Sequence, residues 1–200
     1  MKTTILATLL SVTLLSSASY AADESLSSYG FFFKPYVGAD YDEYHVNYSN
    51  GNGGVFADNF NGGDVHVGAR VHKYLGFEVS YFDTASEDNS FVYSGTTLNT
   101  SAKLEGWTLD AMGYLPLDES QKFELIGTVG LARTAAKGTA RAVSTVSLSD
   151  TETKGRIGGG AQYWITDNLN VRGLVRYQDA SFGGTIDDAI ISTIGLNWQF

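Results

Sequence analysis

The stretch "DVHVGARVHKYLGFEVSYF", residues 64–82, contains two runs in which apolar residues alternate with polar or small ones. In the first run every odd position from Val65 to Val71 is apolar, and in the second every odd position from Leu75 to Tyr81 is apolar. A period of two places the two sets of side chains on opposite faces of an extended strand. Only two residues separate the runs, so the stretch predicts a β-hairpin with one apolar face.

Six further segments show the same alternation: residues 33–44, 103–115, 123–133, 156–165, 169–178 and 192–200. The connections after the second, fourth and sixth segments have the size of hairpin turns, whereas residues 45–63, 83–102, 134–155 and 179–188 form longer connections. Short and long connections therefore alternate along the chain. We expect eight antiparallel strands in an up-and-down order, with all short turns at one end and all long loops at the other.

Composition supports this class and excludes several others. The 200 residues fit one domain, and 23 Gly, 2 Pro and 13% aromatic residues suit extended strands. Cys is absent, which excludes disulfides, zinc-thiolate sites and thiol nucleophiles.

The N-terminus has the pattern of a secretory signal peptide. Lys2 precedes an apolar stretch from Ile5 to Leu15, and small residues lead to a cleavage-type site ending at Ala21. We expect a signal peptide at residues 1–21 and one domain at residues 22–200. Without Lys2 the net charge of −9 becomes −10, which makes a nucleic-acid ligand a poor expectation.

No segment after the signal resembles a membrane-spanning helix, so a membrane location would require strands. Lipid offers no hydrogen bonds to the backbone, and a spanning sheet must therefore close on itself. Even strand number, strands of about ten residues and alternating short and long connections are typical of outer-membrane barrels. The predicted fold is an all-β, eight-stranded, antiparallel, up-and-down transmembrane β-barrel with short periplasmic turns and long extracellular loops.

The polar face of the strands predicts a filled interior. Small barrels have an interior that side chains can fill, and the interior glycines would make room for long charged neighbours. We expect opposite charges to pair across the lumen and plug it. The expected interior charges are Asp40, Asp42, Asp64, Glu78, Asp110 and Glu124 with Arg70, Arg156, Arg172 and Arg176.

The apolar face carries aromatic residues near both strand ends, as in the interfacial girdles of membrane barrels. The expected girdle residues are Phe77, Phe123 and Tyr163 toward the short turns, and Tyr41, Tyr81, Trp107 and Tyr177 toward the long loops.

Four motifs give the sequence a family resemblance: "KPYVGADY" (34–41), "LGFEVSYF" (75–82), "GGGAQYWITDNLNVRGLVRYQ" (158–178) and the terminal "IGLNWQF" (194–200). In this order the sequence resembles the small eight-stranded outer-membrane barrels of Gram-negative bacteria, the OmpA/OmpX type, over essentially the whole mature chain. The resemblance implies a location in the outer membrane. It also implies that the last strand is a signal for the barrel assembly machinery, carried by Ile194, Leu196, Trp198 and Phe200. Larger relatives add a peptidoglycan-binding domain, which we do not expect because nothing follows Phe200.

Residues that could support chemistry are few. A lipid A deacylase would need a Ser–His pair at the outer rim, and His45 and Ser49 are the nearest candidates, with no convincing acidic partner. His66 and His72 lie about 20 Å apart along one strand, too far to share a metal ion. We interpret both as interior hydrogen-bonding residues, and we expect no enzymatic activity, cofactor or metal.

Four readings of function remain open. The first is a structural or surface-interaction protein whose loops contact a host or surface ligand, with outer-membrane lipid and lipopolysaccharide as further partners. The second is a small pore. The third is a soluble lipocalin-like carrier, and the fourth is a lipid A-modifying barrel enzyme.

Overall fold

The computed structural model describes residues 30–48, 58–93, 96–141, 145–179 and 186–200. The predicted signal peptide lies outside these ranges. The described residues form nine strands: β1 (Phe31–Tyr48), β2 (Asn59–His72), β3 (Leu75–Thr84), β4 (Glu87–Tyr93), β5 (Thr96–Pro116), β6 (Phe123–Arg141), β7 (Thr145–Trp164), β8 (Leu169–Asp179) and β9 (Ile186–Gln199). Within these ranges no helix has the length and apolar character needed to cross a membrane.

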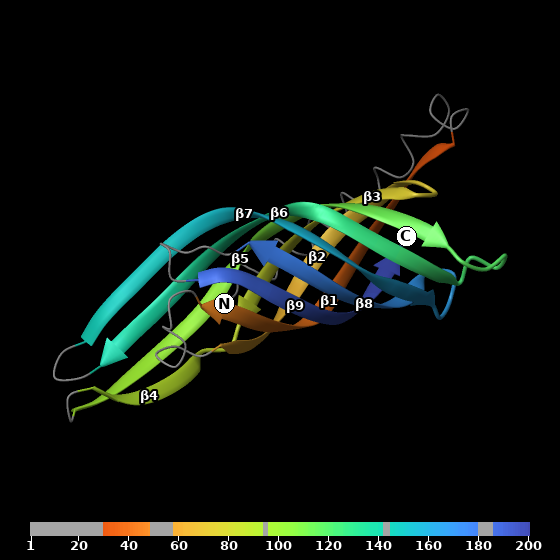
Figure 1. Ribbon diagram of the computed structural model, residues 1–200. Coiled ribbons are helices and arrows are strands. Elements are labelled where there is room, and N and C mark those ends of the chain that lie inside the picture. The colour runs from red at the N-terminus through yellow and green to blue at the C-terminus, as the bar shows by residue number, and fades with distance from the viewer. Residues whose placement is uncertain (1–29, 49–57, 94–95, 142–144, 180–185) are drawn as a thin grey trace, which may run out of the picture.

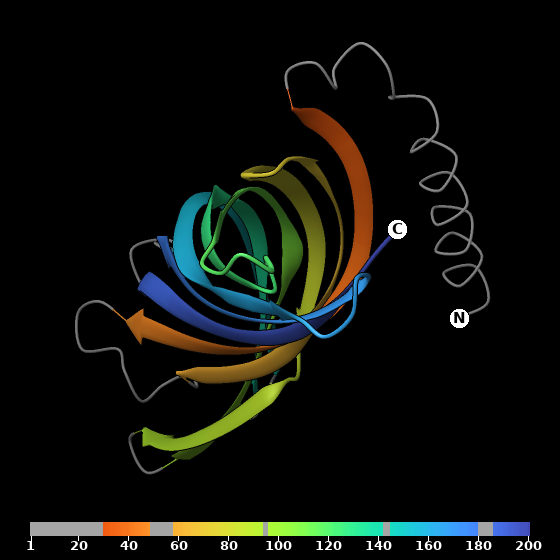
Figure 2. The same cartoon turned by 90° about the vertical axis from the view of Figure 1, so that its right-hand side faces the viewer.

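The strands form one closed antiparallel ring. Their order is β3-β2-β1-β9-β8-β7-β6-β5, and a further pairing of β3 with β5 closes the circle. Figure 2 shows the strands curving round a common axis. Eight strands make the ring, as the alternating segments predict.

The ninth strand, β4, corrects the prediction that residues 83–102 form a loop. β3 pairs with β5 up to Asp83↔Glu105, and β4 resumes the pairing at Glu87↔Ala102. From Asp83 to Glu87 the chain advances four residues, whereas its partner β5 spans three from Ala102 to Glu105. The break between β3 and β4 therefore holds one extra residue. β4 therefore continues β3 past an irregularity of the β-bulge type.

The predicted connection 134–155 is also wrong, because strand pairing covers most of it. β6 and β7 stay paired from Phe123↔Tyr163 to Arg141↔Thr145, whereas β7 pairs with β8 only from Arg156 onward. Figure 1 shows β4, β5, β6 and β7 reaching beyond the other strands at the long-loop end. We call this extension the projecting sheet. It consists of β4 and the adjoining parts of β5 (96–102), β6 (134–141) and β7 (145–155). A strand that continues beyond the ring need not have one apolar and one polar face, so a period of two is not required there.

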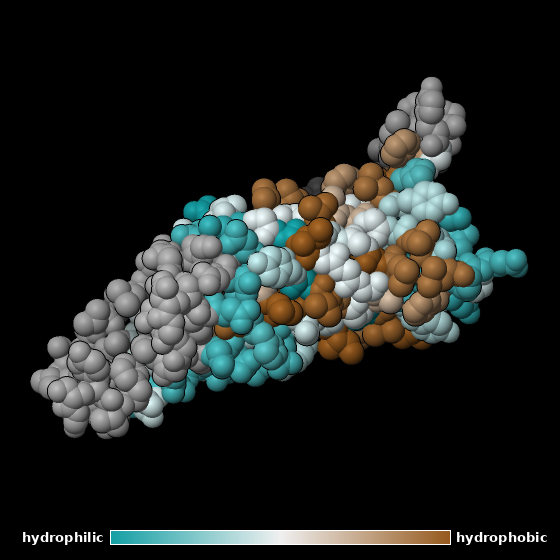
Figure 3. Space-filling model, in the orientation of Figure 1, coloured by the Kyte–Doolittle hydropathy of each residue, from teal (hydrophilic) through white to brown (hydrophobic). Residues whose placement is uncertain are grey.

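Inside and outside alternate along the ring strands. The outward positions are large and apolar, for example Val65, Leu109, Ile157 and Ile194, which are 53% to 62% exposed. In Figure 3 apolar residues gather over the ring, and hydrophilic residues cover the surface toward the projecting sheet. The inward positions hold most of the buried polar side chains. The outer surface of the ring is therefore apolar and its interior is polar. This is the inverse of a water-soluble barrel.

The short turns are fixed by side-chain hydrogen bonds. After β5, Asp118 Oδ1 accepts from the backbone N–H of Phe123 at 2.9 Å, and Oδ2 accepts from the Ser120 hydroxyl. The Ser120 hydroxyl, followed by the Phe123 N–H, lowers the pKa of Asp118. After β7, the Thr166 hydroxyl oxygen accepts from the N–H of Leu169 at 3.0 Å.

Candidate functional site

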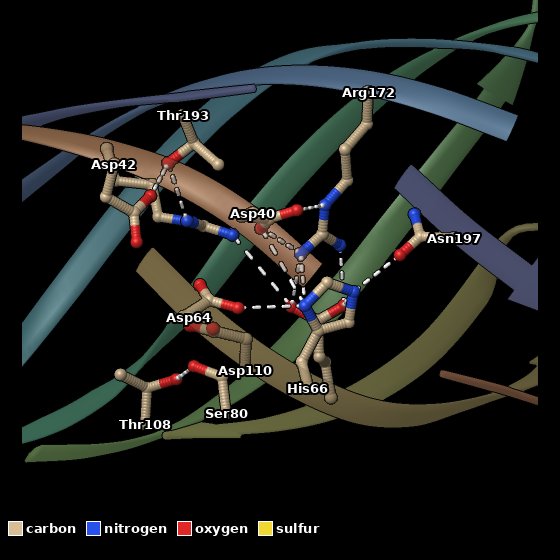
Figure 4. Close-up of polar contacts among 12 residues, drawn as sticks. Asp40, Asp42, Asp64, His66, Ser80, Thr108, Asp110, Arg172, Thr193 and Asn197 are labelled. Atoms are coloured by element: carbon tan, nitrogen blue, oxygen red, sulfur yellow. Dashed lines mark hydrogen bonds and ion pairs between the residues drawn. The ribbon is translucent and has the colours of Figure 1, made fainter. Parts of the chain in front are cut away.

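All ten ionisable residues expected in the interior are buried inside the ring. Arg172 on β8 is central among them. It donates to Asp40 through Nε at 3.2 Å and Nη2 at 2.5 Å, and to Glu78 through Nη1 at 2.6 Å. Figure 4 shows the Arg172 guanidinium reaching Asp40 and lying beside His66. One cation thus ties β8 to β1 and, across the lumen, to β3, and the bidentate geometry is the strong form of such contacts.

A second ion pair lies toward the short-turn end. Arg70 donates to both oxygens of Glu124 at 3.0 and 2.6 Å, and its guanidinium lies 4.3 Å from the ring centroid of Tyr114. Gln162 and Trp164 also donate to Glu124, at 2.6 and 2.9 Å. The carboxylate is therefore well satisfied where it is buried, as a buried charge must be.

A third group lies toward the long-loop end. Arg156 donates to Asp110 through Nε at 2.7 Å and also through Nη2. Arg176 donates to the Thr193 hydroxyl at 3.1 Å, and that hydroxyl donates to Asp42 at 2.5 Å. Arg176 lies 3.9 Å from Glu78, and its Nε and Nη2 atoms have no hydrogen-bond partner among the described residues.

His66 joins the central group. Its Nδ1 lies 2.9 Å from Asp64 Oδ1 and its Nε2 lies 2.5 Å from Asn197 Oδ1. Ligand atoms of Asp40, Asp64 and His66 lie within 4.8 Å of one another, a spacing that suits a metal ion. Arg172 already fills that position, with Nη2 contacting Asp40 and lying 3.3 Å from His66 Nδ1.

His72 does not lie in the interior, so the interpretation of both histidines as interior residues is wrong for this one. His72 lies at the first short turn and packs between Phe31 and Tyr74, at ring distances of 5.3 and 5.5 Å. Its Nδ1 accepts from the backbone N–H of Tyr74.

An apolar cluster lies above the charges, toward the long-loop end, and its members come from most strands of the ring. It consists of Tyr44, Val46, Phe60, Phe82, Leu104, Ala189 and Ile191. A smaller cluster of Met112, Tyr114, Ile126 and Leu174 lies lower down. Sequence reasoning missed both clusters because the inward positions were taken as polar. The signal was Phe82 for the first cluster and Ile126 for the second, since both are apolar residues on the otherwise polar face of predicted strands.

The interior glycines are required by this packing, as expected from their place on the polar face. A side chain at Gly195 would begin 1.7 Å from Asp40 Oδ1, and one at Gly130 would begin 2.1 Å from Asp110 Oδ1. At Gly38 a Cβ would meet both His66 and Asn197 at 2.2 Å. Each glycine makes the room that a charged or polar neighbour occupies.

The structure places the seven aromatic residues proposed as girdles on the outer surface. Tyr41, Trp107, Tyr177, Phe77, Phe123 and Tyr163 are exposed, and Tyr81 packs on Trp107 with ring centroids 4.8 Å apart. The proposed assembly residues Ile194, Leu196 and Trp198 also face outward on β9. Phe200 follows β9, and its backbone N–H donates to the carbonyl of Pro35 on β1.

The structure describes only one of the two residues considered for hydrolysis. His45 faces outward, and its Nε2 lies 4.0 Å from Glu43 Oε1. Ser49 lies outside the described residues. No Ser–His contact can therefore be drawn at this rim.

The projecting sheet holds a polar groove of about 480 Å³. Carboxylate, amide and hydroxyl side chains line it: Asp88, Asn89, Ser90, Asn99, Thr100, Ser101 and Thr139. Below the groove, ion pairs on the outer face join Lys103 to Asp83 at 2.7 Å and Lys137 to Glu105 at 2.5 Å.

Comparison with solved structures shows the same fold in several bacterial proteins. Ail, the attachment invasion locus protein of Yersinia pestis, superposes with a TM-score of 0.58 at 16% identity, covering 84% of this chain and 98% of Ail. Neisserial surface protein A gives 0.57 at 18% identity, covering 83% and 97%. OprG from Pseudomonas aeruginosa gives 0.55 at 11% identity, covering 84% and 95%. No curated protein sequence matches the chain.

Structural likeness at such low identity shows only the fold, whereas a match to a family model shows the family. The model described as the outer membrane protein beta-barrel domain matches residues 7–200, nearly the whole chain. The closed eight-stranded ring, its apolar outer wall and this match agree. The chain therefore belongs to the outer membrane protein beta-barrel domain family and lies in the outer membrane.

Proposed function

We propose that this protein is a surface-interaction protein and that the projecting sheet is its contact site. The observation that carries the proposal is the continued pairing of β6 with β7 up to Arg141↔Thr145, well beyond the ring. Over the residues that the structure describes, the barrel carries a paired sheet on its extracellular side. A preorganised surface loses less conformational entropy on binding than a flexible loop.

The polar groove indicates the chemistry of the partner. Its amide and hydroxyl groups suit an uncharged hydrogen-bonding ligand, such as a polypeptide segment or a neutral glycan. Ail has been solved in complex with sucrose octasulfate, a heparin analogue. The net charge of −9 in this chain argues against a sulfated ligand here.

Shortening one hairpin tests the proposal. Ala136 pairs with Asp150, so an Asn-Gly turn between them can replace residues 137–149 without changing the register. Cells producing the shortened protein should lose adhesion to immobilised serum and matrix proteins, and neither version should bind immobilised heparin. Heat-modifiable gel mobility controls for barrel assembly. Equal adhesion by both versions would refute the assignment.

We further propose that the barrel does not conduct. The ion pairs of Arg70 and Arg172 cross the lumen, that of Arg156 joins β7 to β5, and the apolar cluster lies above them. Charged layers and apolar constrictions each oppose ion passage. These features support a plugged interior in preference to a pore.

The outer wall suggests where lipid partners bind. Arg133 and Lys137 face outward on β6, and Arg133 pairs in register with Trp107 at the proposed upper girdle. Cations at this height suit the phosphates of lipopolysaccharide. The outward, aromatic end of β9 and Phe200 support its role as the signal for the barrel assembly machinery.

The proposal includes no catalytic activity. The outward His45 lies beside Glu43, but the described residues supply it with no nucleophile. A rim histidine at the headgroup boundary accounts for its position.

A further inference from the structure

Four strands in succession carry a glycine on the outer wall of the barrel. Gly113, Gly127, Gly159 and Gly173 come from β5, β6, β7 and β8, and the first three lie directly across from one another. Each has at least one large apolar strand neighbour on the same face, namely Leu115, Val129, Ile157 and Val175 respectively. The wall is therefore locally thinned at bilayer depth.

The last two of these glycines belong to a groove of about 360 Å³. Val175, Ile194 and Tyr41 form its sides, and Ser192 and Glu43 lie at its upper part. Gly159, Val175, Ser192 and Glu43 are successive partners across β7, β8, β9 and β1, so the groove crosses four strands. The other lining residues, Gly160, Leu174 and Thr193, lie between outward positions on the same strands, and Leu174 and Thr193 are buried.

Packing within the protein does not require glycine at positions 113, 127 and 173, whereas a Cβ at Gly159 would lie 3.3 Å from the carbonyl oxygen of Ile126. A Cβ at Gly173 would meet its nearest atom at 3.9 Å, an ordinary contact, and one at Gly127 would meet nothing within 4 Å. Interior glycines differ, since a Cβ at Gly160 would lie 1.9 Å from the carbonyl oxygen of Gly173. Glycine within a strand costs about 0.5–1 kcal/mol and often marks the close approach of another molecule. Here that molecule must come from outside the chain.

The position of the groove identifies the leaflet. β1 runs toward the extracellular end, and the groove extends from Glu43 and Tyr41 on β1 down to the middle of β7 and β8. It therefore lies in the outer leaflet, whose lipid in this membrane is lipopolysaccharide. A thin, flexible acyl chain in the groove contacts protein on several sides, which increases its dispersion energy over that of a chain on a convex wall.

Charge argues against a second copy of the barrel as the occupant. Glu43 and Asp188 both lie on this wall near the extracellular end. In a two-fold dimer formed through this wall, the Glu43 carboxylates of the two copies would be buried in one apolar interface. Like charges in such a low-dielectric interface repel each other. With a lipid chain in the groove, Glu43 stays at headgroup level, where its side chain is 49% exposed.

We propose that the groove across β7, β8, β9 and β1 holds one acyl chain of lipid A. The site is distinct from the phosphate contact proposed at Arg133 and Lys137, which lies on β6. It deepens the proposed partnership with lipopolysaccharide by naming the part of the lipid that this wall binds.

Photo-crosslinking of the purified full-length barrel tests the site. The probe residue p-benzoylphenylalanine takes the place of Ile194 at the groove or of Leu109, which faces lipid on β5, four strands away round the ring. The folded protein in mild detergent is titrated with rough lipopolysaccharide and irradiated. We expect lipopolysaccharide adducts from the Ile194 position at concentrations where the Leu109 position gives none.

Filling the groove provides the decisive comparison. Gly173→Leu should reduce the adduct from the Ile194 position roughly fivefold, equivalent to about 1 kcal/mol. Ser192→Leu fills the groove from the neighbouring strand without changing a glycine and should act alike. Gly127→Leu, also outward but outside the groove, should leave the adduct unchanged. Heat-modifiable mobility identifies folded protein in each case.

Three results would overturn the proposal: equal adducts at both probe positions, an adduct insensitive to Gly173→Leu and Ser192→Leu, or a dimer-sized adduct. Competition by excess phosphatidylethanolamine would show that the site takes any diacyl lipid and would overturn lipid A as its ligand. Loss of the phosphate contact through Arg133→Ala and Lys137→Ala should leave the Ile194 adduct in place. The two lipid proposals can therefore fail separately.

Discussion

At the scale of single residues, the barrel depends on buried charges that have few alternatives to their present partners. Arg172 holds two carboxylates that lie on different strands, Asp40 and Glu78. Neither carboxylate is reached by solvent, since both side chains are completely buried. Removing a shared partner therefore leaves two charges without compensation in a low-dielectric interior.

Arg172→Met should lower the free energy of unfolding by about 3–5 kcal/mol, because Met fills the space but cannot neutralise Asp40 and Glu78. Urea unfolding in lipid vesicles, followed by Trp fluorescence, measures the change. Arg133→Met on the outer face is the matched control and should stay within about 0.5 kcal/mol of the wild type. Similar losses in both variants would contradict a specific role for the buried guanidinium.

A second prediction compares two glycines, one that faces the interior and one that faces outward. Gly195→Ala should destabilise the barrel by roughly 1–3 kcal/mol, because the new methyl group would overlap Asp40, which Arg172 holds in place. Gly127→Ala should be neutral or stabilise by up to about 1 kcal/mol, since its Cβ meets nothing within 4 Å. Unfolding midpoints in urea compare the two. Equal effects would show that the interior is looser than these contacts indicate.

At the scale of elements, the last strand closes the ring by pairing with both β8 and β1. Its outer face carries the residues proposed as the assembly signal. Position in the chain, rather than exposure, distinguishes Phe200 from other outward aromatics, because Phe123 has the same 41% exposure.

Phe200→Ala should therefore reduce the amount of assembled barrel in the outer membrane more than Phe123→Ala does. Both variants remove similar lipid-facing area, so a difference reports recognition of the chain end by the assembly machinery. Heat-modifiable mobility of membrane fractions measures assembled protein. Equal yields would count against the signal.

The turn between β5 and β6 should make part of the stability of the barrel depend on pH. The Ser120 hydroxyl and the N–H of Phe123 lower the pKa of Asp118 in the folded protein. A carboxyl with a depressed pKa stabilises the fold above its ordinary pKa of about 4, and this contribution is lost as the pH falls through the depressed value. Asp118→Asn should be less stable than the wild type at neutral pH, and the difference should vanish in acid. Urea midpoints across this pH range test it, and a difference independent of pH would exclude the carboxylate as its source.

At the scale of the whole molecule, the ring is a container whose outer wall suits lipid and whose interior suits neither lipid nor free water. Ion pairs occupy the lower and middle lumen, and apolar side chains occupy the extracellular end. The two fillings oppose ion flow in different ways, one by fixed charge pairs and the other by excluding water.

The reconstituted barrel should accordingly show no conductance steps in planar bilayers. Phe82→Ala, which opens the apolar cluster alone, should remain silent because the charge layers still fill the lumen. Stable ohmic steps from the wild-type protein, dependent on protein concentration and absent from mock preparations, would establish a pore instead.

The sequence by itself determined the ring. Alternation with a period of two reports which face of a strand meets the apolar environment, and this local property identified all eight ring strands and the alternation of short and long connections. The same logic failed for β4 and the upper parts of β6 and β7. These segments continue beyond the ring, where a strand need not have one apolar and one polar face.

Only the tertiary structure decided which charges meet, because partners such as Arg172 and Glu78 lie 94 residues apart and on strands that are not neighbours. Strand register and closure bring them across the lumen, and a linear pattern carries neither. The apolar cluster and the outer groove arise in the same way, from side chains of several strands at one height. Alternation fixes the face of each residue, but the height of each residue in the barrel is set by how the strands close.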